Sequence, residues 1–448
     1  MLSVQPESIM EVPANLLWRI QPMRVDLAFG QKGLTVDLPE GFRYRVLEAR
    51  SAVPLDSAEE AVRRALDAPT ASLPLRDLAR GKPSAAISVC DITRPVPNRL
   101  ILPAILSDLE TAGIPRGKVT ILIATGLHRP ATPAEVREIC GEDIAARYRI
   151  VNHNARALAE HRHLGSTASG TPVYIDERFI SAALHITVGF IEPHLMLGFS
   201  GGRKLIAPGL AAQETIKVLH SPQFMRDRHA CEGSIEQNPL HLELLEIARM
   251  ARHDFLVDVA LARGTGQRPI AAVFAGDPVQ AHREGVRLVS QVMLETLDEP
   301  VDAVITTGAG YPLDLTFYQS IKGITAASQV VKPGGKILLM AACTEGAGGK
   351  EFSKLLAEHG SDRKFMDHIL HAPVVVDQWQ LEKLGLVTCN AEVLYHVPGL
   401  PDEFQGSLWG KAYPTADAAV QALTSGLAPA ATIAVIPEGP YVLARARP

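Results

Sequence analysis

The 448-residue sequence lacks the features that define several large classes of protein. Its five cysteines are widely spaced and form no C-x-x-C pair, so neither a disulfide framework nor a cysteine zinc site is indicated. No apolar run approaches the roughly 20 residues that a membrane-spanning helix needs. Residues 1–15 are acidic and lack the basic and then apolar pattern of a signal peptide. Together these absences predict a protein of the reducing cytoplasm, with no membrane partner.

An excess of positive charge is also missing. The formal net charge is −5 and the pI is about 6.3, which argues against nucleic acid as the main partner. Hydrophobic residues make up 47% of the chain and charged residues 21%, the proportions of an ordinary globular protein. The length exceeds that of one ordinary hydrophobic core, so we expect two domains.

Two common phosphate-binding motifs are absent. A P-loop starting at Gly198 would need a second glycine at position 203 and a hydroxyl at position 205, where the chain has Arg203 and Leu205. The dinucleotide pattern G-x-G-x-x-G begins at Gly308 and Gly310 but meets Leu313 at its third position. An ordinary nicotinamide dinucleotide is therefore not expected as the cofactor.

Strand-like and helix-like segments alternate along the chain. This order predicts the α/β class, with two doubly wound domains of mostly parallel sheet. We expect an N-terminal extension at residues 1–22, a first α/β domain at 23–298 and a second at 299–448, whose last 30 or so residues could pack back on the first. The expected strands include residues 85–89, 119–124, 183–191, 301–306 and 336–341, and the expected helices include 57–67, 100–112, 133–139, 213–219 and 320–331.

Polar side chains cluster where the predicted strands end. In parallel sheets, ligands bind at the carboxyl ends of the strands, so these clusters are expected to share one rim. The clusters contain Asp91 and Arg94 after the first strand, His128 after the second, His194 after the third, and Tyr318, Gln319 and Lys322 after a strand of the second domain. One such cluster carries little weight, whereas several at one rim indicate an active site.

The segment after His194 is rich in glycine. Ser200, Gly201 and Gly202 lead directly into Arg203 and Lys204. Glycines allow backbone N–H groups to turn inward around an anion, and Lys204 adds a possible nucleophile, in a loop that we expect at the surface. Simpler interpretations stay open, because the glycines could form only a turn.

Simpler interpretations also exist for the other clusters. Asp91 could cap the helix that follows it, and Arg94 could form an ordinary surface ion pair. His153, His161 and His163 lie in polar surroundings and are expected to face solvent.

His220 follows the predicted helix at residues 213–219 and precedes Ser221 and Pro222. Neutral imidazole is a good ligand for nickel, zinc, copper or iron. A single histidine is a poor metal site by itself, and it becomes a reasonable one only if a cofactor supplies the other ligands.

Taken together, these segments resemble the lactate racemase family, the nickel-pincer-nucleotide enzymes. The resemblance extends from about residue 24 to near the end of the chain and is carried by Asp91-Ile92-Thr93-Arg94-Pro95, Thr125-Gly126-Leu127-His128-Arg129, His194 with Ser200 to Lys204, Leu219-His220-Ser221-Pro222, Tyr318-Gln319-Ser320-Ile321-Lys322 and Asp377-Gln378-Trp379-Gln380. It implies a racemase or epimerase of 2-hydroxy acids, with the active site in a cleft between two α/β domains.

The resemblance also implies a role for each matching residue. Lys204 would hold a nickel-pincer nucleotide covalently, His220 would bind the nickel, and His128 and His194 would serve as acid and base. Asp91, Ser200, Gly201, Gly202 and Arg203 are then expected near the cofactor, and Arg94, Tyr318, Gln319, Lys322 and Trp379 near the substrate. The partners would be a small 2-hydroxy acid and the enzymes that mature the cofactor.

Elementary chemistry agrees with such a reaction. The carboxylate of a 2-hydroxy acid opposes a carbanion at C2, whereas hydride removal gives a neutral ketone. A base must take the hydroxyl proton, and the two enantiomers place that hydroxyl on different sides, so two bases are expected. Two alternatives remain: a nucleotide- or phosphate-binding protein that uses the loop from Ser200 to Lys204 without redox chemistry, and a zinc hydrolase that uses His128, His194 and His220.

Overall fold

The computed structural model describes residues 18–19, 23–48, 50–263 and 268–447. Most of the predicted extension at residues 1–22 lies outside these ranges. Of its described residues, Arg19 forms an antiparallel bridge with Tyr44. Within the described ranges, no helix is both long and apolar enough to cross a membrane.

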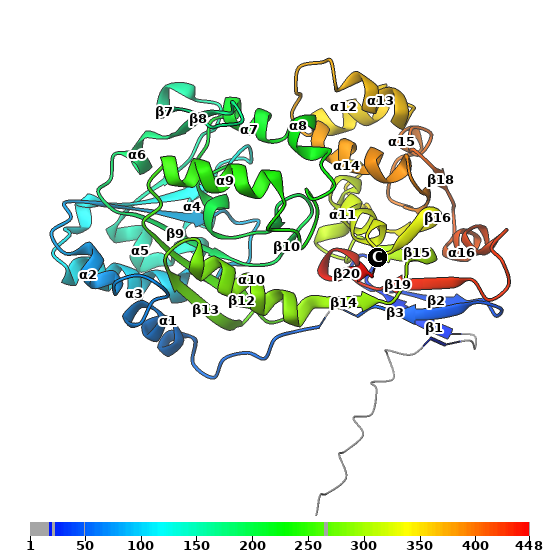
Figure 1. Cartoon of the computed structure of the whole chain (residues 1–448), viewed down its shortest axis with the longest axis horizontal. Coiled ribbons are helices and arrows are strands. Elements are labelled where there is room, and N and C mark those ends of the chain that lie inside the picture. Colours follow the sequence, from blue (N-terminus) through cyan, green and yellow to red (C-terminus); the bar gives the residue numbers. More distant parts are fainter. Residues whose placement is uncertain (1–17, 20–22, 49, 264–267, 448) are drawn as a thin grey trace, which may run out of the picture. The chain divides into compact units, whose positions relative to one another are not determined.

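The chain divides into two compact units, each with its own six-stranded sheet (Figure 1). The first, here called the central unit, comprises residues 50–293 and 372–379. The second, here called the terminal unit, comprises the residues before 50 together with 294–371 and 380–448. The predicted α/β class with two sheets is confirmed.

The sheet of the central unit has the strand order β13-β12-β9-β4-β5-β6. All neighbours are parallel except β13, which pairs antiparallel with β12 at one edge. The chain leaves β4 toward β5 and β6 on one side and later adds β9 and β12 on the other, so the strand order reverses between β4 and β9. The six strands are β4 (Ala85–Cys90), β5 (Val119–Ala124), β6 (Arg149–Asn152), β9 (His185–Phe190), β12 (Phe255–Leu261) and β13 (Ile270–Gly276).

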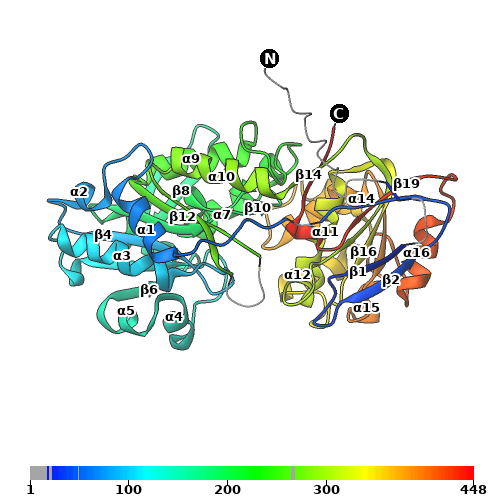
Figure 2. The ribbon, with the colours of Figure 1, turned by 90° about the horizontal axis from the view of Figure 1, so that it is seen from below.

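Helices cover both faces of this sheet, as Figures 1 and 2 show. One core contains buried residues of α1 to α5 and the other contains residues of α6 to α9, while alternate residues of the strands, such as Ile87 and Ala86, point into one core or the other. The helices are α1 (Ala58–Asp67), α2 (Leu75–Ala79), α3 (Asn98–Thr111), α4 (Pro133–Cys140), α5 (Glu142–Arg147), α6 (Glu177–Ile180), α7 (Gln213–Leu219), α8 (Pro222–Met225), α9 (Pro239–Met250) and α10 (Gln280–Met293). Two short hairpins are added by β7 (His161–Ser166) with β8 (Pro172–Asp176) and by β10 (Pro193–His194) with β11 (Gly198–Phe199).

The sheet of the terminal unit is parallel throughout, in the order β18-β17-β16-β15-β19-β3. Its order reverses between β15 and β19. The strands are β3 (Arg43–Val46), β15 (Val301–Thr307), β16 (Val331–Met340), β17 (Glu392–His396), β18 (Lys411–Ala412) and β19 (Thr432–Ile436). The helices are α11 (Phe317–Ser328), α12 (Lys350–Glu358), α13 (Asp362–His368), α14 (Gln378–Thr388), α15 (Asp402–Gln405) and α16 (Ala416–Thr424), and two further pairs are β1 (Met23–Leu27) with β2 (Leu34–Leu38) and β14 (Leu294–Leu297) with β20 (Leu443–Ala446).

The structure divides the chain between residues 293 and 294, close to the boundary predicted at residue 298, but it does not place residues 23–48 in the same unit as the segment that follows them. The hairpin of β1 and β2 packs in a core of the terminal unit, and β3 is the edge strand of the terminal sheet beside β19. Residues 23–48 therefore belong with the C-terminal half of the chain. Local sequence patterns identify these strands, but they carry no information about a pairing partner that lies almost the full chain length away.

Candidate active site

The predicted site residues of the central unit follow adjacent strands. In the sheet, β9, β4 and β5 are neighbours and run parallel, so their carboxyl ends meet at one edge. Asp91 and Arg94 follow β4, His128 follows β5, and His194 follows β9. The edge between β4 and β9 is also where the strand order reverses, the usual position of a ligand site in a doubly wound sheet.

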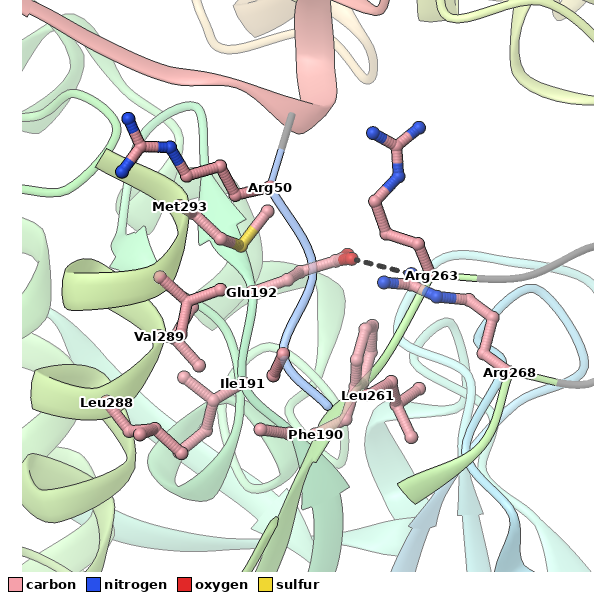
Figure 3. A pocket seen from close by; sticks show the side chains of 13 residues that line it. Arg50, Phe190, Ile191, Glu192, Leu261, Arg263, Arg268, Leu288, Val289 and Met293 are labelled. Carbon is pink, nitrogen blue, oxygen red and sulfur yellow. Dashed lines mark ion pairs between the residues drawn. The ribbon is translucent and has the colours of Figure 1, made fainter. Parts of the chain in front are cut away.

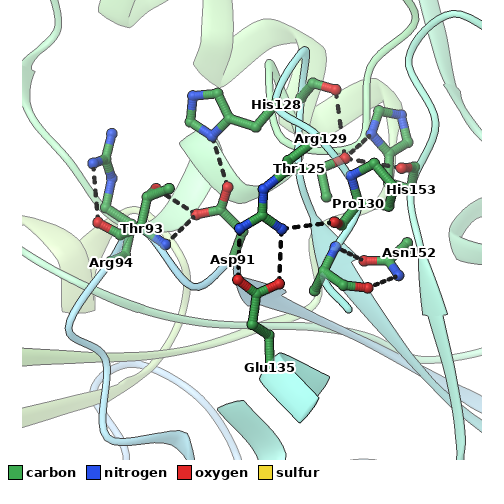
Figure 4. A network of polar contacts seen from close by, with 12 residues as sticks. Asp91, Thr93, Arg94, Thr125, His128, Arg129, Pro130, Glu135, Asn152 and His153 are labelled. Carbon is green, nitrogen blue, oxygen red and sulfur yellow. Dashed lines mark hydrogen bonds and ion pairs between the residues drawn. The ribbon is translucent and has the colours of Figure 1, made fainter. Parts of the chain in front are cut away.

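Asp91 and His128 form a hydrogen-bonded pair (Figure 4). The Nδ1 atom of His128 lies 2.6 Å from Oδ2 of Asp91, and Oδ1 of Asp91 accepts hydrogen bonds from the Thr93 backbone N–H (3.2 Å) and hydroxyl (2.6 Å). Burial opposes the charged carboxylate, but the hydrogen bond and charge of His128 outweigh it, so the pKa of Asp91 is lowered. An ionised carboxylate only accepts hydrogen bonds, so Nδ1 of His128 carries a proton, and in the neutral form of the ring Nε2 keeps its lone pair.

The loop that carries His128 is fixed at both ends. Gly126 has a φ of +54° and donates its N–H to the Gly209 carbonyl at 3.0 Å. On the other side, Thr132 and Glu135 form a capping box at the start of α4, and Arg129 donates two hydrogen bonds to Glu135 (Figure 4). The His128 side chain is 53% exposed, whereas that of Asp91 is 6% exposed. The imidazole is thus accessible on a rigid support.

Replacing Asp91 with asparagine should lower kcat by about 10- to 100-fold, the usual cost of losing the partner that orients a functional histidine. The carboxylate fixes the Nδ1–H tautomer and stabilises the imidazolium, and an amide does neither as well. Steady-state assays across pH of the racemisation that the resemblance implies measure this effect. The matched control is Asp143→Asn, because Asp143 pairs with Arg147 at the surface of α5. Equal kcat values for Asp91→Asn and the parent would contradict a positioning role for Asp91.

His194 has the opposite tautomer when neutral. It lies in β10, which pairs with β11. Its Nδ1 accepts long hydrogen bonds from the backbone N–H groups of Met196 (3.4 Å) and Leu197 (3.3 Å). A nitrogen that accepts hydrogen bonds carries no proton, so the proton of the neutral ring is on Nε2. His128 therefore presents a lone pair at Nε2, and His194 presents an N–H there.

The glycine-rich loop, expected at the surface of the cleft, is largely buried. The four residues before Lys204 are buried, whereas Lys204 itself is partly exposed. The Ser200 hydroxyl donates to the Phe190 carbonyl (2.8 Å) and accepts from the Glu192 N–H (3.0 Å). Its hydrogen bonds therefore join the loop to the end of β9.

Arg203 is directed into the protein. Its side chain is 2% exposed, and its guanidinium donates to the carbonyls of Leu197 (3.2 Å) and Phe199 (2.9 Å) and lies 2.8 Å from Nε2 of His282. In this structure the Arg203 side chain is a support for the loop, although its position in the sequence suggested contact with the cofactor.

Lys204 lies among the other predicted site residues. Burial raises the pKa of the Cys90 thiol to about 12, and the charges that act on it further include those of Asp91, Arg94 and Lys204. The Lys204 charge also acts on His220. Since such effects fall off with distance, the end of β4, Lys204 and His220 occupy one region of the central unit.

His220 is held in a form suited to bind a metal. Its Nδ1 lies 2.8 Å from the Ile216 carbonyl oxygen, which can only accept, so Nδ1–H donates and Nε2 keeps its lone pair. Burial lowers the pKa of His220 to about 4, with a smaller contribution from the Lys204 charge. The ring of Trp379 packs beside it, with 4.5 Å between ring centroids. Within the described ranges, no three or more His, Cys, Asp or Glu side chains are grouped to hold a metal ion.

The other predicted substrate residues lie in the terminal unit, on the first turns of α11 after β15. Gln319 and Lys322 are three residues apart and so share a helix face. The Gln319 Oε1 atom is buried and has no hydrogen-bond partner among the described residues, which is the state expected of an atom that awaits a ligand. The Tyr318 ring packs edge-on against Phe352, with centroids 5.0 Å apart. That these residues face those of the central unit stays a prediction.

Two features of the site region were missed by sequence reasoning. Asp258 lies inside the apolar strand β12 and contacts the glycine-rich loop, and a carboxylate in an otherwise apolar strand is the signal that could have revealed it. His153, expected to face solvent, is buried, and its Nε2 lies 2.9 Å from that of His161. Polar sequence neighbours suggested exposure, but His153 follows β6 and contacts Thr125, which follows β5, and His161 of β7.

A pocket beside the carboxyl ends of β9 and β12 contains none of the predicted site residues among those that line it (Figure 3). Its walls are mostly apolar, with side chains from α10, and Arg268 lies 3.8 Å from Glu192 at its rim. The residues that carry the expected chemistry are therefore separate from this pocket.

Fold and site together define a doubly wound α/β protein whose candidate histidines and lysine follow adjacent parallel strands. Residues 29–233 match the family model described as the lactate racemase N-terminal domain, and residues 297–444 match that of the lactate racemase C-terminal domain. The chain is 33% identical to a lactate racemase of Thermoanaerobacterium thermosaccharolyticum and 32% identical to one of Lactiplantibacillus plantarum, in each case over 94% of this chain and 99% of the relative.

Solved structures agree. The lactate racemase apoprotein of T. thermosaccharolyticum matches with a TM-score of 0.87 at 33% identity, over 94% of this chain and all of that one. A Thermotoga maritima protein with 16% identity and a TM-score of 0.63, matched over 88% of this chain and all of that one, shares the fold. The chain belongs to the lactate racemase family and is an isomerase of the racemase type.

Proposed function

We propose that the protein inverts the C2 centre of a 2-hydroxy acid by reversible hydride transfer, with His128 and His194 as the acid and base. The observation that carries the proposal is the pair of opposite tautomers, fixed by Asp91 on one side and by backbone N–H groups on the other. A racemase must take the hydroxyl proton of either enantiomer and give it back, so two histidines that are each held in one orientation suit the task.

Lys204 and His220 fit the nickel-pincer nucleotide that the family resemblance implies. Lys204 is partly exposed at the end of a buried loop, and His220 offers a neutral Nε2 in the same region. Lys204 would hold the nucleotide covalently, and His220 would be the protein ligand of its nickel. The chemistry that such a cofactor supplies when bound is reversible acceptance of a hydride from C2.

The remaining residues would bind and orient the substrate. Arg94 and Lys322 are cations suited to its carboxylate, and Gln319 offers a buried amide oxygen without a partner among the described residues. Tyr318 and Trp379 would contact the apolar part of the substrate. Lactate is the first candidate substrate, because the similar curated proteins are named for it. We further propose that the enzymes that mature the cofactor act on this chain, and that it works in the cytoplasm.

The direct test is a racemisation assay on holoprotein produced together with the maturation enzymes. Each pure enantiomer of lactate and of a panel of other 2-hydroxy acids is incubated with the protein, and the products are separated by chiral chromatography. Inversion of at least one acid is expected. Nickel-loaded protein that inverts none of them would refute the proposed substrate class.

Replacing His220 with alanine should cause loss of nickel while Lys204 stays modified. One of the metal's ligands disappears, but the covalent link does not depend on it. Elemental analysis gives the nickel content, and the mass of the Lys204 peptide gives the modification. The control is His163→Ala, an exposed histidine of β7. A nickel content equal to that of the control would count against His220 as a ligand.

A further inference from the structure

A buried carboxylate lies beneath the glycine-rich loop. Asp258 is in the middle of β12 and is fully buried. Neither of its oxygens has a hydrogen-bond partner by strict geometry within the described ranges. Burying a charged carboxylate destabilises the fold unless nearby groups compensate for the lost hydration, so the groups that surround Asp258 decide whether its charge is tolerated.

Glycines surround this carboxylate. A Cβ atom added to Gly201 would lie 2.3 Å from Oδ2 of Asp258, and one added to Gly189 would lie 2.8 Å from Oδ1. Gly201 and Gly202 also have φ values of +85° and +48°, which side chains rarely adopt. The glycines of the loop therefore allow the backbone to close around the Asp258 carboxylate.

The positive charge of Arg203 acts on the Asp258 carboxylate. Burial raises the pKa of Asp258 to about 7, while the Arg203 guanidinium and the Gly202 amide favour its charged form. Burial in turn lowers the pKa of Arg203 to about 9, against the attraction of Asp258. His282, on α10, completes the group, because its Nε2 lies 2.8 Å both from Arg203 Nη1 and from the Ser200 carbonyl oxygen.

We propose that the Asp258 carboxylate is the anion that the glycine-rich loop encloses, and that Asp258, Arg203 and His282 are positioning residues that hold Lys204 in place for cofactor attachment. The attachment step rests on the proposed function, whereas the enclosed carboxylate does not. It follows that the loop amides are not a phosphate site, which removes the support for the alternative of a phosphate-binding protein.

Hydrogen exchange of the apoprotein, followed by mass spectrometry, tests the enclosed carboxylate. In Asp258→Asn, amides of residues 196–206 should exchange faster by about tenfold or more, the scale of losing one charge-assisted contact. The matched control is Asp254→Asn, because Asp254 immediately precedes β12, at the opposite end from the loop, and pairs with His185. Unchanged exchange in Asp258→Asn, or an equal increase in both variants, overturns the proposal.

A second hydrogen-exchange experiment uses inorganic phosphate and needs no variant. Added to the unsubstituted apoprotein, it should leave the exchange of residues 196–206 unchanged. Slower exchange in phosphate would show that the loop binds an external anion and would overturn the proposal, even if Asp258→Asn failed to fold. If Asp258→Asn does not fold, Arg203→Lys replaces it in the exchange experiment, because lysine keeps the positive charge but lacks the several N–H donors of the guanidinium group.

Cofactor loading tests the positioning role. In protein produced with the maturation enzymes, the fraction of Lys204 that is modified should fall in Asp258→Asn and stay at the parent level in Asp254→Asn. Full loading of Asp258→Asn would contradict positioning. If the parent protein itself shows no adduct, the proposed function fails, but the exchange results still decide whether the loop encloses Asp258.

Discussion

Lys204→Ala should abolish both cofactor attachment and racemase activity while the fold stays intact. The amine is the only group that the proposal gives for the covalent link, so no partial function is expected. The fold should survive because Lys204 is partly exposed, and because the backbone hydrogen bond from its N–H to the Gly201 carbonyl at 3.1 Å does not need the side chain. Intact mass, chiral chromatography and thermal unfolding measure the three outcomes.

The control for this experiment is Lys118→Ala. Lys118 is exposed and directly precedes β5, so it lies at the amino edge of the sheet, away from the predicted site. Full activity is expected there. Racemase activity in Lys204→Ala from protein made with the cofactor pathway would refute the assignment of Lys204, and a large loss of thermal stability would show that its role is structural.

His128→Ala and His194→Ala should each stop net racemisation, with a rate loss of about 10²- to 10⁴-fold, the usual worth of one positioned acid or base. The two variants should differ in the enantiomer that they still oxidise. When its ring is neutral, His128 presents an unprotonated Nε2, and Asp91 holds the ring in that form. The His128→Ala variant should therefore fail to oxidise the enantiomer whose hydroxyl group faces the position of His128.

Single-turnover experiments with each pure enantiomer show the difference. Cofactor reduction, followed by absorbance, should appear for one hand in one variant and for the other hand in the second variant. His161→Ala serves as the control, because His161 contacts His153 rather than any predicted site residue. Identical behaviour of the two variants toward both hands would contradict the two-base picture. A loss far below the expected range would place that histidine away from the substrate.

Elements with a strong local pattern were predictable from the sequence. The strand at residues 119–124 and the helix at 213–219 match β5 and α7, because a buried run and an amphipathic period are local signals. The same holds for the rim of the site, since polar residues after parallel strands necessarily meet at one edge. This reasoning could predict that Asp91 and His128 lie near each other, but not that they form a hydrogen bond.

Features that depend on distant partners were not predictable. We expected the glycine-rich loop at the surface of the cleft, yet α9, His282 of α10 and the strand ends cover it. Arg203 looked like an anion ligand until its guanidinium was seen among loop carbonyls. In both cases, the burial comes largely from segments that are distant in the sequence and leave no local mark.

The pairing of β3 with β19 has a consequence for protein synthesis. On the ribosome, residues 43–46 emerge long before their neighbour at residues 432–436. Until then β3 has no strand to join, and the central unit can complete its sheet first. The terminal unit can therefore complete its sheet only after β19 has emerged, and a nascent chain stalled before β19 would carry β3 without its neighbouring strand.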